Sequence, residues 1–357
     1  MPIPPPTTRG LWYADDDTDL GDASGGQPPK KFLFSLTGKC NLRCDHCPRG
    51  VLEVAAHETP VELVEHVIRD ILPAVRSIRL GGTDLGEQLT SRHFNRFLEA
   101  VLATPPKHLE LVSNLTVLDA ARADLIVRAC SELGVSLEGV GPAFERVRHF
   151  PWSKIERHLE MLAEARARHP ESRLEIFALV TCFHDNLHEL ESILDLADRG
   201  VRRFEFRLFR PTLPEQASQA LEHHRGEANA VFARLRARAA ARGLQVALPP
   251  SFPIAPLVPP ANPPQADASR EATARWVCHF PFEAMSLYSD GRVSPCCEEI
   301  YLGQVDPRAP DLLSIFRSAP WRELRESLLE GRPSGRCVDC ELRRSRQAEL
   351  ELAAPAR

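Results

Sequence analysis

The chain has 357 residues, of which 43% are hydrophobic and 26% are charged, and its formal net charge is −5. This composition is typical of a globular protein, and the negative charge argues against a scaffold held on nucleic acid by phosphate contacts. No apolar run approaches the roughly 18 residues of a membrane-spanning helix, and the N-terminus lacks the pattern of a signal peptide. We therefore expect a cytoplasmic protein without nucleic-acid or membrane partners, whose ten cysteines serve metal binding or catalysis instead of disulfides.

The first 211 residues divide into a leader and an alternating α/β region. Residues 1–30 are rich in Pro, Gly and Asp, and we expect them to be a poorly ordered leader. Apolar runs predict strands at 32–36, 77–80, 109–113, 135–137, 174–181 and 203–208, and helical periodicity predicts helices at 61–75, 94–102, 119–133, 152–168 and 187–199. Thr59 and Glu62 have the spacing of a capping box. Six successive β/α units imply parallel strands covered by helices, in a doubly wound sheet or a barrel.

Three cysteines, Cys40, Cys44 and Cys47, follow the first predicted strand within eight residues. Thiolates on one loop suit an iron–sulfur cluster, and three of them leave one iron of a [4Fe–4S] cluster open to a non-protein ligand. A zinc knuckle with His46 as fourth ligand is the alternative, although zinc ligands usually come in C-x2-C or H-x3-H pairs. The C-x3-C-x2-C spacing therefore favours an iron–sulfur cluster.

This motif, following a strand near the N-terminus, resembles that of the radical S-adenosylmethionine (SAM) superfamily. The resemblance implies an α/β fold with a partial (β/α)6 barrel, which we place at residues 31–248. It also implies an enzyme whose [4Fe–4S] cluster binds S-adenosylmethionine at the open iron and cleaves it reductively to a 5′-deoxyadenosyl radical. An external electron donor such as flavodoxin or ferredoxin is then an expected partner.

A glycine-rich run, residues 80–89, follows the second predicted strand, and parallel α/β folds collect ligands at such strand ends. It resembles the family's glycine-glycine-glutamate region, which lies near the SAM amino group. Two registers match, one with Gly81, Gly82 and Asp84 and the other with Gly86 and Glu87. The Gly-Glu-x-Leu run favours the second register, and a tight turn before a helix is the structural alternative.

The next two strand ends also resemble SAM-contact motifs of the family. Ser113 and Asn114 are similar to its threonine-asparagine-glycine turn. Ser136 and Glu138 resemble a serine and an acid near the SAM ribose, and Arg148 an arginine near the SAM carboxylate. A glutamate stands where the family usually has aspartate, which weakens the ribose assignment for Glu138.

Cys182 ends the fifth predicted strand, where we expect side chains to face the cavity. A lone cysteine is usually a small buried hydrophobe. The functional alternative is a catalytic one, in which Cys182 donates a hydrogen atom to a substrate radical.

A Pro-rich linker is predicted at residues 249–265, because closely spaced prolines fit neither a helix nor a central strand. The region beyond it, residues 266–345, carries Cys278, Cys296, Cys337 and Cys340, and residues 346–357 form a tail. Apolar runs around Asp290-Gly291 predict a β-hairpin, and helices are predicted at 314–316 and 321–329. Four separated cysteines are compatible with a zinc ribbon or a fully ligated iron–sulfur cluster.

The run Asp290-Gly-Arg-Val-Ser-Pro-Cys-Cys297, with the later C-x2-C pair, resembles the C-terminal extension of SPASM and twitch radical SAM enzymes. Because no cysteine follows Cys340, the resemblance points to the shorter twitch type. It implies one auxiliary [4Fe–4S] cluster on Cys278, Cys296, Cys337 and Cys340, with Cys297 able to replace Cys296.

These resemblances imply hydrogen abstraction from a substrate C–H bond, followed by oxidation (dehydrogenation) or epimerisation. We expect a small polar natural-product intermediate as substrate, with maturation or crosslinking of a ribosomally made peptide as the alternative. A non-catalytic, metal-stabilised binding protein is a remote third hypothesis.

Overall fold

The structure is a computed structural model that describes residues 22–50, 57–105, 107–253, 278–296, 300–333, 335–338 and 340. The predicted tail, most of the leader and most of the Pro-rich linker lie outside these residues. The chain groups into two compact units: unit 1 is Met1–Phe34, Pro60–Ile78 and Val258–Arg357, and unit 2 is Ser35–Thr59 and Arg79–Leu257. The first strand and helix therefore group with the C-terminal region, and the predicted boundaries at 248 and 266 stay a prediction.

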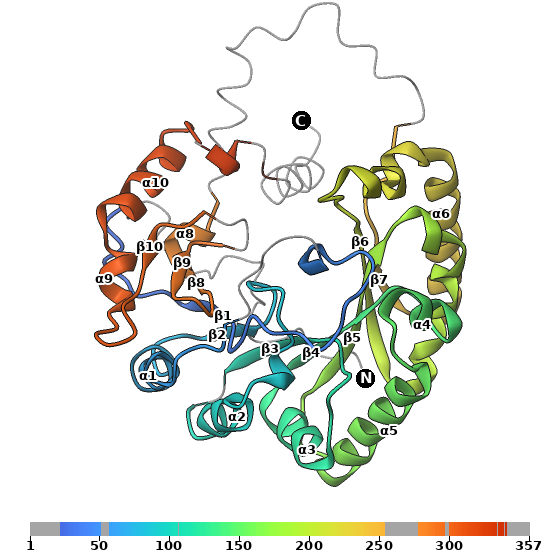
Figure 1. Ribbon diagram of the computed structural model, residues 1–357, viewed down its shortest axis with the longest axis horizontal. Helices are drawn as coiled ribbons and strands as arrows, with labels where there is room; N and C mark the ends of the chain where they lie inside the picture. The colour runs from blue at the N-terminus through green and yellow to red at the C-terminus, as the bar shows by residue number, and fades with distance from the viewer. Residues whose placement is uncertain are drawn as a thin grey trace, which may run out of the picture. The chain divides into compact units, whose positions relative to one another are not determined.

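Unit 2 is built on five neighbouring parallel strands. They are, in order, β3 (His108–Ser113), β4 (Glu132–Leu137), β5 (Glu175–Cys182), β6 (Val201–Leu208) and β7 (Gln245–Ala247). Figure 1 shows α2, α3, α5 and α6 on the outer side of these strands. The predicted parallel strands are present, and their carboxyl ends gather the polar residues described below.

The helices of unit 2 follow the predicted order. They are α2 (Phe94–Leu102), α3 (Ala120–Ala129), α4 (Pro142–Arg148), α5 (Trp152–Arg168) and α6 (Arg225–Arg242), with 3-10 helices η1 (Pro48–Gly50), η3 (Gln88–Thr90), η4 (His184–Arg199), η5 (Pro214–Gln219) and η6 (Leu221–His223). The helix predicted at 119–133 is too long. The backbone becomes extended at Cys130, and Glu132 already pairs with Glu175 in the sheet. Pairing with two neighbouring strands outweighs local helical periodicity there.

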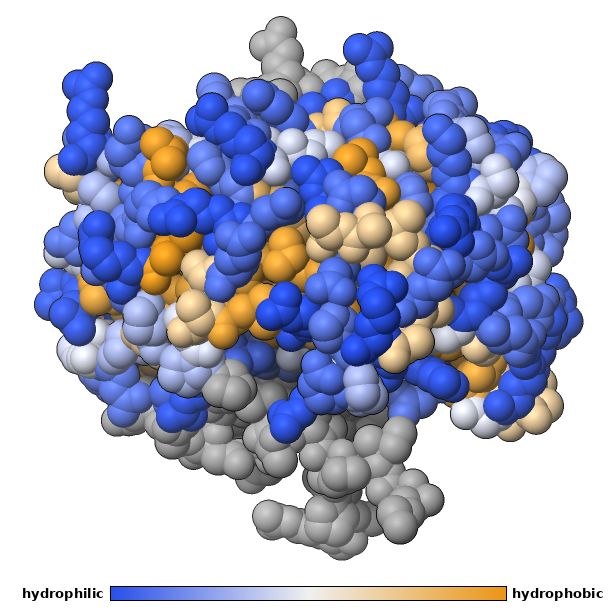
Figure 2. Space-filling model, turned by 90° about the horizontal axis from the view of Figure 1, so that it is seen from below, coloured by the Kyte–Doolittle hydropathy of each residue, from blue (hydrophilic) through white to orange (hydrophobic). Residues whose placement is uncertain are grey.

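The core of unit 2 lies between its strands and helices. Phe97, Ile126, Leu159 and Phe177 contribute fully buried side chains from four different elements. Seen from the helical side, Figure 2 shows mostly hydrophilic residues with small hydrophobic groups between them. The helices are thus amphipathic, as the sequence periodicity predicts. None of the helices in the described ranges combines the length and apolar character that crossing a bilayer requires.

Unit 1 contains a parallel strand pair and a hairpin. Its elements are β1 (Lys31–Phe34), α1 (Val61–His66), the π-helix η2 (Val67–Ile71), the start of β2 (Ser77–Leu80), α8 (Phe280–Glu283), β8 (Ala284–Leu287), β9 (Arg292–Ser294), β10 (Gly303–Gln304), α9 (Leu312–Phe316), α10 (Ala319–Leu329) and the 3-10 helix η7 (Gly335–Cys337). β8 pairs with β1 in parallel and with β9 antiparallel, so the predicted hairpin is present. The predicted capping box is wrong, because the Thr59 hydroxyl donates to Ser35 O instead of capping α1.

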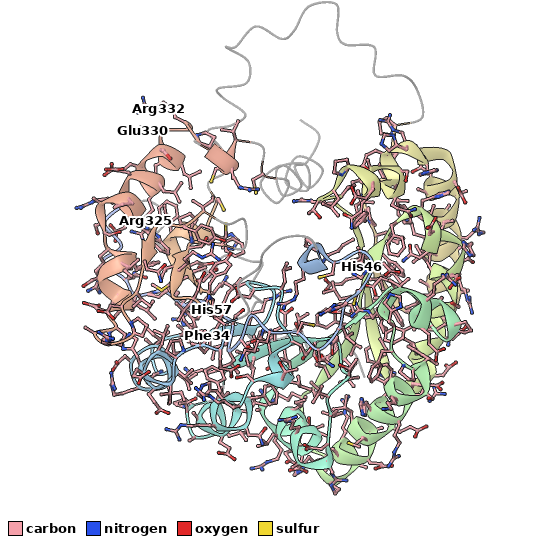
Figure 3. The ribbon with its side chains drawn as sticks, in the orientation of Figure 1. Phe34, His46, His57, Arg325, Glu330 and Arg332 are labelled. Atoms are coloured by element: carbon pink, nitrogen blue, oxygen red, sulfur yellow. The ribbon has the colours of Figure 1, made fainter. Side chains whose placement is uncertain are left out.

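Two buried cations hold unit 1 together. Lys31 on β1 forms an ion pair with Glu283 at 2.6 Å, and both side chains are fully buried. Arg325 on α10 (labelled in Figure 3) donates to Pro281 O at 2.7 Å and to Phe316 O at 3.0 Å. Its guanidinium also donates to Ala23 O at 3.2 Å. Segments distant in sequence are therefore joined by charged side chains whose hydrogen bonds are made inside the protein.

Candidate functional site

The loop with Cys40, Cys44 and Cys47 is held in place by its backbone. Cys47 N donates to Cys44 O at 3.0 Å, and Asp45 N donates to Val147 O at 3.1 Å. Gln216 Nε2 on η5 donates to Asp45 O at 3.3 Å. The loop that carries the three thiols is thus fixed to α4 and η5 within unit 2.

The three thiols have the properties of a metal site. Burial raises the pKa of Cys40, and burial, with smaller contributions from Glu138 and the neighbouring cysteines, raises the pKa of Cys44 to about 12. Leu42 N and Asn114 Nδ2 donate to Cys40 Sγ, at 3.5 and 3.7 Å. Three thiolates on one loop repel one another unless a cation lies beside them, so the set fits a [4Fe–4S] cluster.

The glycine-rich turn after β2 lies against the cysteine loop. A Cβ on Gly86 would stand 2.1 Å from Thr37 O, so only glycine allows this approach. Gly81 and Gly82 both have φ near +90°, at the bend where β2 ends. Asp84 is partly exposed, and its backbone N–H donates to the Ser35 hydroxyl at 3.1 Å.

Glu87, next to Gly86, is buried and binds the end of β3. Its carboxylate accepts from the Ser113 hydroxyl at 2.8 Å, from Asn114 N at 2.6 Å and from Leu89 N at 3.0 Å. Burial raises the pKa of Glu87, and these hydrogen bonds partly oppose the rise. Three predicted contact residues, Glu87, Ser113 and Asn114, therefore lie together beside Cys40.

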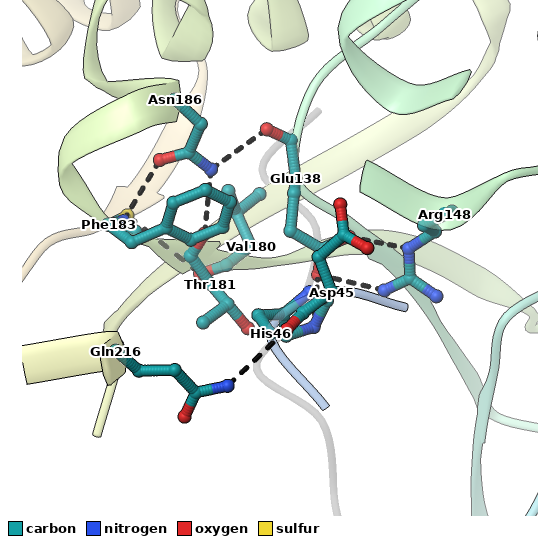
Figure 4. A network of polar contacts seen from close by, with 10 residues as sticks. Asp45, His46, Glu138, Arg148, Val180, Thr181, Phe183, Asn186 and Gln216 are labelled. Atoms are coloured by element: carbon teal, nitrogen blue, oxygen red, sulfur yellow. Dashed lines mark hydrogen bonds and ion pairs between the residues drawn. The ribbon is translucent and has the colours of Figure 1, made fainter. Parts of the chain in front are cut away.

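A buried charged cluster follows β4 (Figure 4). Arg148 Nη2 donates to Glu138 Oε1 at 2.8 Å, and its Nε donates to the other carboxylate oxygen. Burial alone would raise the pKa of Glu138, but the Arg148 charge, His46 and the hydrogen bonds from Arg148 together outweigh burial and lower that pKa. Ser136, two residues earlier, lies on the same face of the strand and is partly exposed.

His46 joins this cluster from the cysteine loop. Its Nε2 lies 3.3 Å from Glu138 Oε1, and its ring stacks on Phe183 with centroids 6.0 Å apart. Its Nδ1 is buried and makes no hydrogen bond within the described part of the chain. Since Nε2 faces Glu138, only Nδ1 is left to bind a further group, which is also the arrangement of a metal-binding histidine. The contacts of His46 therefore do not by themselves decide between the zinc alternative and the iron–sulfur cluster.

Cys182 is fully buried at the end of β5, and its Sγ lies 3.9 Å from Val180 O. Burial raises the pKa of its thiol well above the ordinary range. Asn186 beside it was not predicted: Nδ2 donates to Glu138 O and Thr181 O, both at 2.9 Å, and Oδ1 accepts from Phe183 N. No local sequence pattern identifies an asparagine whose side-chain nitrogen and oxygen are both hydrogen-bonded in this way, because its partners lie at the ends of two strands.

The four C-terminal cysteines line one pocket in unit 1. They are Cys278, Cys296, Cys337 and Cys340, and the other lining residues are Phe280, Pro281, Pro295, Ile300, Leu324, Leu328 and Arg336. No disulfide joins any of the nine cysteines within the described ranges. Four thiols in a mainly apolar pocket fit a fully ligated iron–sulfur cluster. Cys297, the predicted alternative to Cys296, lies outside the described residues.

Two family models match the chain. Residues 34–197 match the radical SAM superfamily, and residues 278–341 match SPASM, an iron-sulfur cluster-binding domain. The GTP 3′,8-cyclase of Synechocystis sp. is 30% identical over 130 residues, which is 35% of this chain and 39% of that protein. The probable GTP 3′,8-cyclase of Methanococcus vannielii is 25% identical over 138 residues, 38% of this chain and 46% of that protein. The matched segment thus spans less than half of either relative.

Solved structures share the fold at low sequence identity. Streptococcus suis SuiB bound to S-adenosylmethionine is 13% identical with a TM-score of 0.61, over 88% of this chain and 71% of that chain. The structure of anSMEcpe with bound AdoMet is 15% identical with a TM-score of 0.60, over 85% and 81%. The predicted α/β fold class, with its small C-terminal domain of hairpin and helices, is confirmed.

Proposed function

Because the chain belongs to the radical SAM superfamily and carries a SPASM domain, we propose that it oxidises a small polar substrate at a C–H bond. The family implies a [4Fe–4S] cluster and S-adenosylmethionine, and the SPASM domain implies auxiliary iron–sulfur ligation. When bound, the first cluster supplies the electron that cleaves SAM to methionine and the 5′-deoxyadenosyl radical, and the auxiliary cluster supplies an electron acceptor. A reductant such as flavodoxin or ferredoxin is the partner that this chemistry requires.

The observation that carries this proposal is the pocket of four cysteines in unit 1. Four protein thiolates leave no iron free to hold a substrate, so a cluster there serves electron transfer. The balance is that of a dehydrogenation. One hydrogen atom leaves the substrate with 5′-deoxyadenosine, a proton passes to solvent, and the remaining electron passes to the acceptor. The choice of the twitch type, with one auxiliary cluster, is part of this proposal.

The chain's own residues prepare the SAM site. We assign the cluster to Cys40, Cys44 and Cys47, and the SAM contacts to the strand ends around them. Glu87 binds the end of β3 and so shapes the glycine turn. The Glu138 carboxylate contacts both Arg148 and His46, which belongs to the loop itself, and so positions the two side chains. In this assignment Arg148 binds the SAM carboxylate, and Gly81, Gly82, Gly86, Asp84 and Ser136 line the rest of the ligand.

Oxidation is favoured over epimerisation by the environment of Cys182. An epimerase needs a donor that returns a hydrogen atom to the substrate radical from the opposite face. A thiol can do so only in contact with substrate, and Cys182 is fully buried. We therefore assign Cys182 the packing role of a small apolar side chain.

Peptide modification is the second candidate. SuiB with its precursor peptide SuiA covers 88% of this chain with a TM-score of 0.59, and anSMEcpe with a bound peptide covers 88% with a TM-score of 0.57. A peptide substrate is therefore compatible with this fold, and the fold alone does not choose between the two substrate classes.

A deuterium-transfer experiment separates the two candidates. Host cells grown in deuterated medium give extracts whose small-molecule and peptide fractions carry C–D bonds. The reduced protein is incubated with each fraction and SAM, and 5′-deoxyadenosine is examined by mass spectrometry. We expect deuterium in 5′-deoxyadenosine from the small-molecule fraction. Transfer from the peptide fraction alone would replace the first candidate by the second, and the same fractions with a Cys40→Ala variant give the background.

A further inference from the structure

His184, His224 and Glu227 come together in unit 2, away from either set of cysteines along the chain. His184 follows the end of β5 and begins η4, whereas His224 and Glu227 lie at the start of α6. One nitrogen or oxygen atom from each side chain lies within 4.8 Å of the others. Two separate segments thus bring two imidazoles and a carboxylate to one point.

Neighbouring groups orient the two imidazole rings. His224 Nε2 lies 2.9 Å from Ser218 O, and because a carbonyl only accepts, Nε2 carries the proton and the neutral ring presents a lone pair at Nδ1. His184 Nδ1 lies 3.5 Å from the Asp185 carboxylate, and its Nε2 lies 3.6 Å from Glu227 Oε2. An imidazole held on one nitrogen by a carbonyl or carboxylate, with the other nitrogen directed to a shared point, is the usual arrangement of metal-binding histidines.

We propose that His184, His224 and Glu227 bind a divalent transition-metal ion of the zinc type. Two imidazoles and one carboxylate are an N/O donor set that suits Zn²⁺ and leaves a fourth position for water. Zinc ligand atoms lie at about 2.0–2.2 Å from the ion, which places them about 3.3 Å from one another in a tetrahedron.

The three ligand atoms need to move only a short way to share one ion. The histidine rings stack at 3.6 Å between centroids and only 13° between planes, so binding tilts one ring toward the ion. The side chains of His184 and Glu227 are 37% and 55% exposed, so both have room to rotate.

An ion bound here would also affect the position of the loop that carries Cys40, Cys44 and Cys47. It would tie the start of η4 to the start of α6, and η5 lies in the chain between β6 and α6. Gln219 on η5 exchanges two hydrogen bonds with Asp185, and Gln216 on η5 donates to Asp45 O between Cys44 and Cys47. The ion therefore acts as a positioning element for the segment that contacts the loop.

The experiment uses anaerobically reconstituted protein, so that clusters occupy the cysteines, equilibrated with Zn²⁺ and desalted. We expect about one zinc ion per chain above the iron content. The double variant His184→Gln/His224→Gln should lose that zinc and keep its iron, while the matched control His223→Gln, an exposed neighbour outside the set, should keep both. Wild-type protein without zinc, or a double variant that retains it, overturns the proposal.

Two further measurements locate the ion. Zinc X-ray absorption should show nitrogen and oxygen ligands near 2.0–2.1 Å, whereas sulfur at about 2.3 Å would place the zinc in a cysteine site and overturn the assignment. Hydrogen exchange of residues 211–224 should slow on zinc addition in the wild type and in His223→Gln but not in the double variant. Unchanged exchange in the wild type would contradict the positioning role.

Discussion

The two groups of cysteines differ in how the chain assembles them. Cys40, Cys44 and Cys47 come from one loop, and ionisable side chains, including Glu87, surround them. The other four come from separate segments between residues 278 and 340 and meet in a pocket lined largely by apolar side chains. A local loop with three thiols preserves an open iron and a polar neighbourhood for a ligand. A pocket closed by four thiols suits electron transfer without substrate binding.

The largest effect is expected from removing one group of thiols at a time. The triple variant Cys40→Ala/Cys44→Ala/Cys47→Ala should bind about four irons instead of about eight and make no 5′-deoxyadenosine under reducing conditions. Iron analysis and chromatography of the nucleoside products check this. Nucleoside formation by the triple variant would refute the assignment of the SAM-binding cluster.

Removing thiols of the C-terminal group should stop substrate oxidation and leave SAM cleavage intact. Cys337→Ala/Cys340→Ala should also leave about four irons, but SAM cleavage should continue while substrate oxidation stops. The melting temperature should fall as well, because metal ligation joins segments that are far apart in sequence. Cys130→Ala is the matched control, since this buried cysteine belongs to neither group and its loss should leave the iron content unchanged.

Breaking the charged cluster beside the loop should cost both stability and SAM affinity. Arg148→Gln leaves Glu138 buried without its partner, which we expect to cost about 3–5 kcal/mol. Loss of a charge-assisted hydrogen bond to SAM should weaken binding by about 10- to 100-fold in equilibrium dialysis. The double variant Glu138→Gln/Arg148→Gln should unfold less readily than Arg148→Gln alone. Unchanged SAM affinity in a folded Arg148→Gln protein would remove Arg148 from the site.

The half-buried carboxylate of Glu132, elsewhere in unit 2, tests whether the loss of SAM affinity is specific to the charged cluster beside the loop. Burial alone would raise the pKa of Glu132, but contacts with His108 and Arg203 hold it at about 2, below the ordinary 4.5. Its ionised form therefore stabilises the fold above about pH 4.5, and that contribution disappears as pH falls toward 2. Glu132→Gln should lose about 2–3 kcal/mol near neutral pH, with the difference from wild type shrinking in acid. The affinity for SAM should not change in Glu132→Gln. A weaker affinity would show that the effect expected for Arg148→Gln is not specific to the charged cluster.

The smallest effect is expected at Cys182. Cys182→Ala removes only a small buried group, so we expect about 1 kcal/mol of destabilisation and nearly intact substrate oxidation. Product analysis in deuterated water completes the test once a substrate is identified. A solvent deuteron on the reacting carbon of an otherwise isomeric product, lost in Cys182→Ala, would overturn oxidation in favour of epimerisation.

Sequence reasoning succeeded where the information is local. The strand at 203–208 and the hairpin around Gly291 appear close to their predicted bounds, since periodicity and turn chemistry report on neighbours in sequence. It failed where partners are distant. Thr59 looked like a helix cap but donates to Ser35 O, and Asn186 carried no signal although it joins the ends of β4 and β5. The ligand roles of the site residues were proposed from resemblance, and the structure adds their contacts.

The grouping of β1 with the C-terminal region has a practical consequence for dissecting the protein. A fragment ending near residue 248 would retain β1 but lose β8, the strand that pairs with it from Lys31 to Phe34. Lys31 would then lose Glu283, the partner of a fully buried ammonium group. The unpaired edge, with its apolar residues Phe32 to Phe34, would become a template for intermolecular strand pairing. Expression of the N-terminal region alone should therefore yield aggregates, and adding residues 278–340 as a second chain should restore a monodisperse protein.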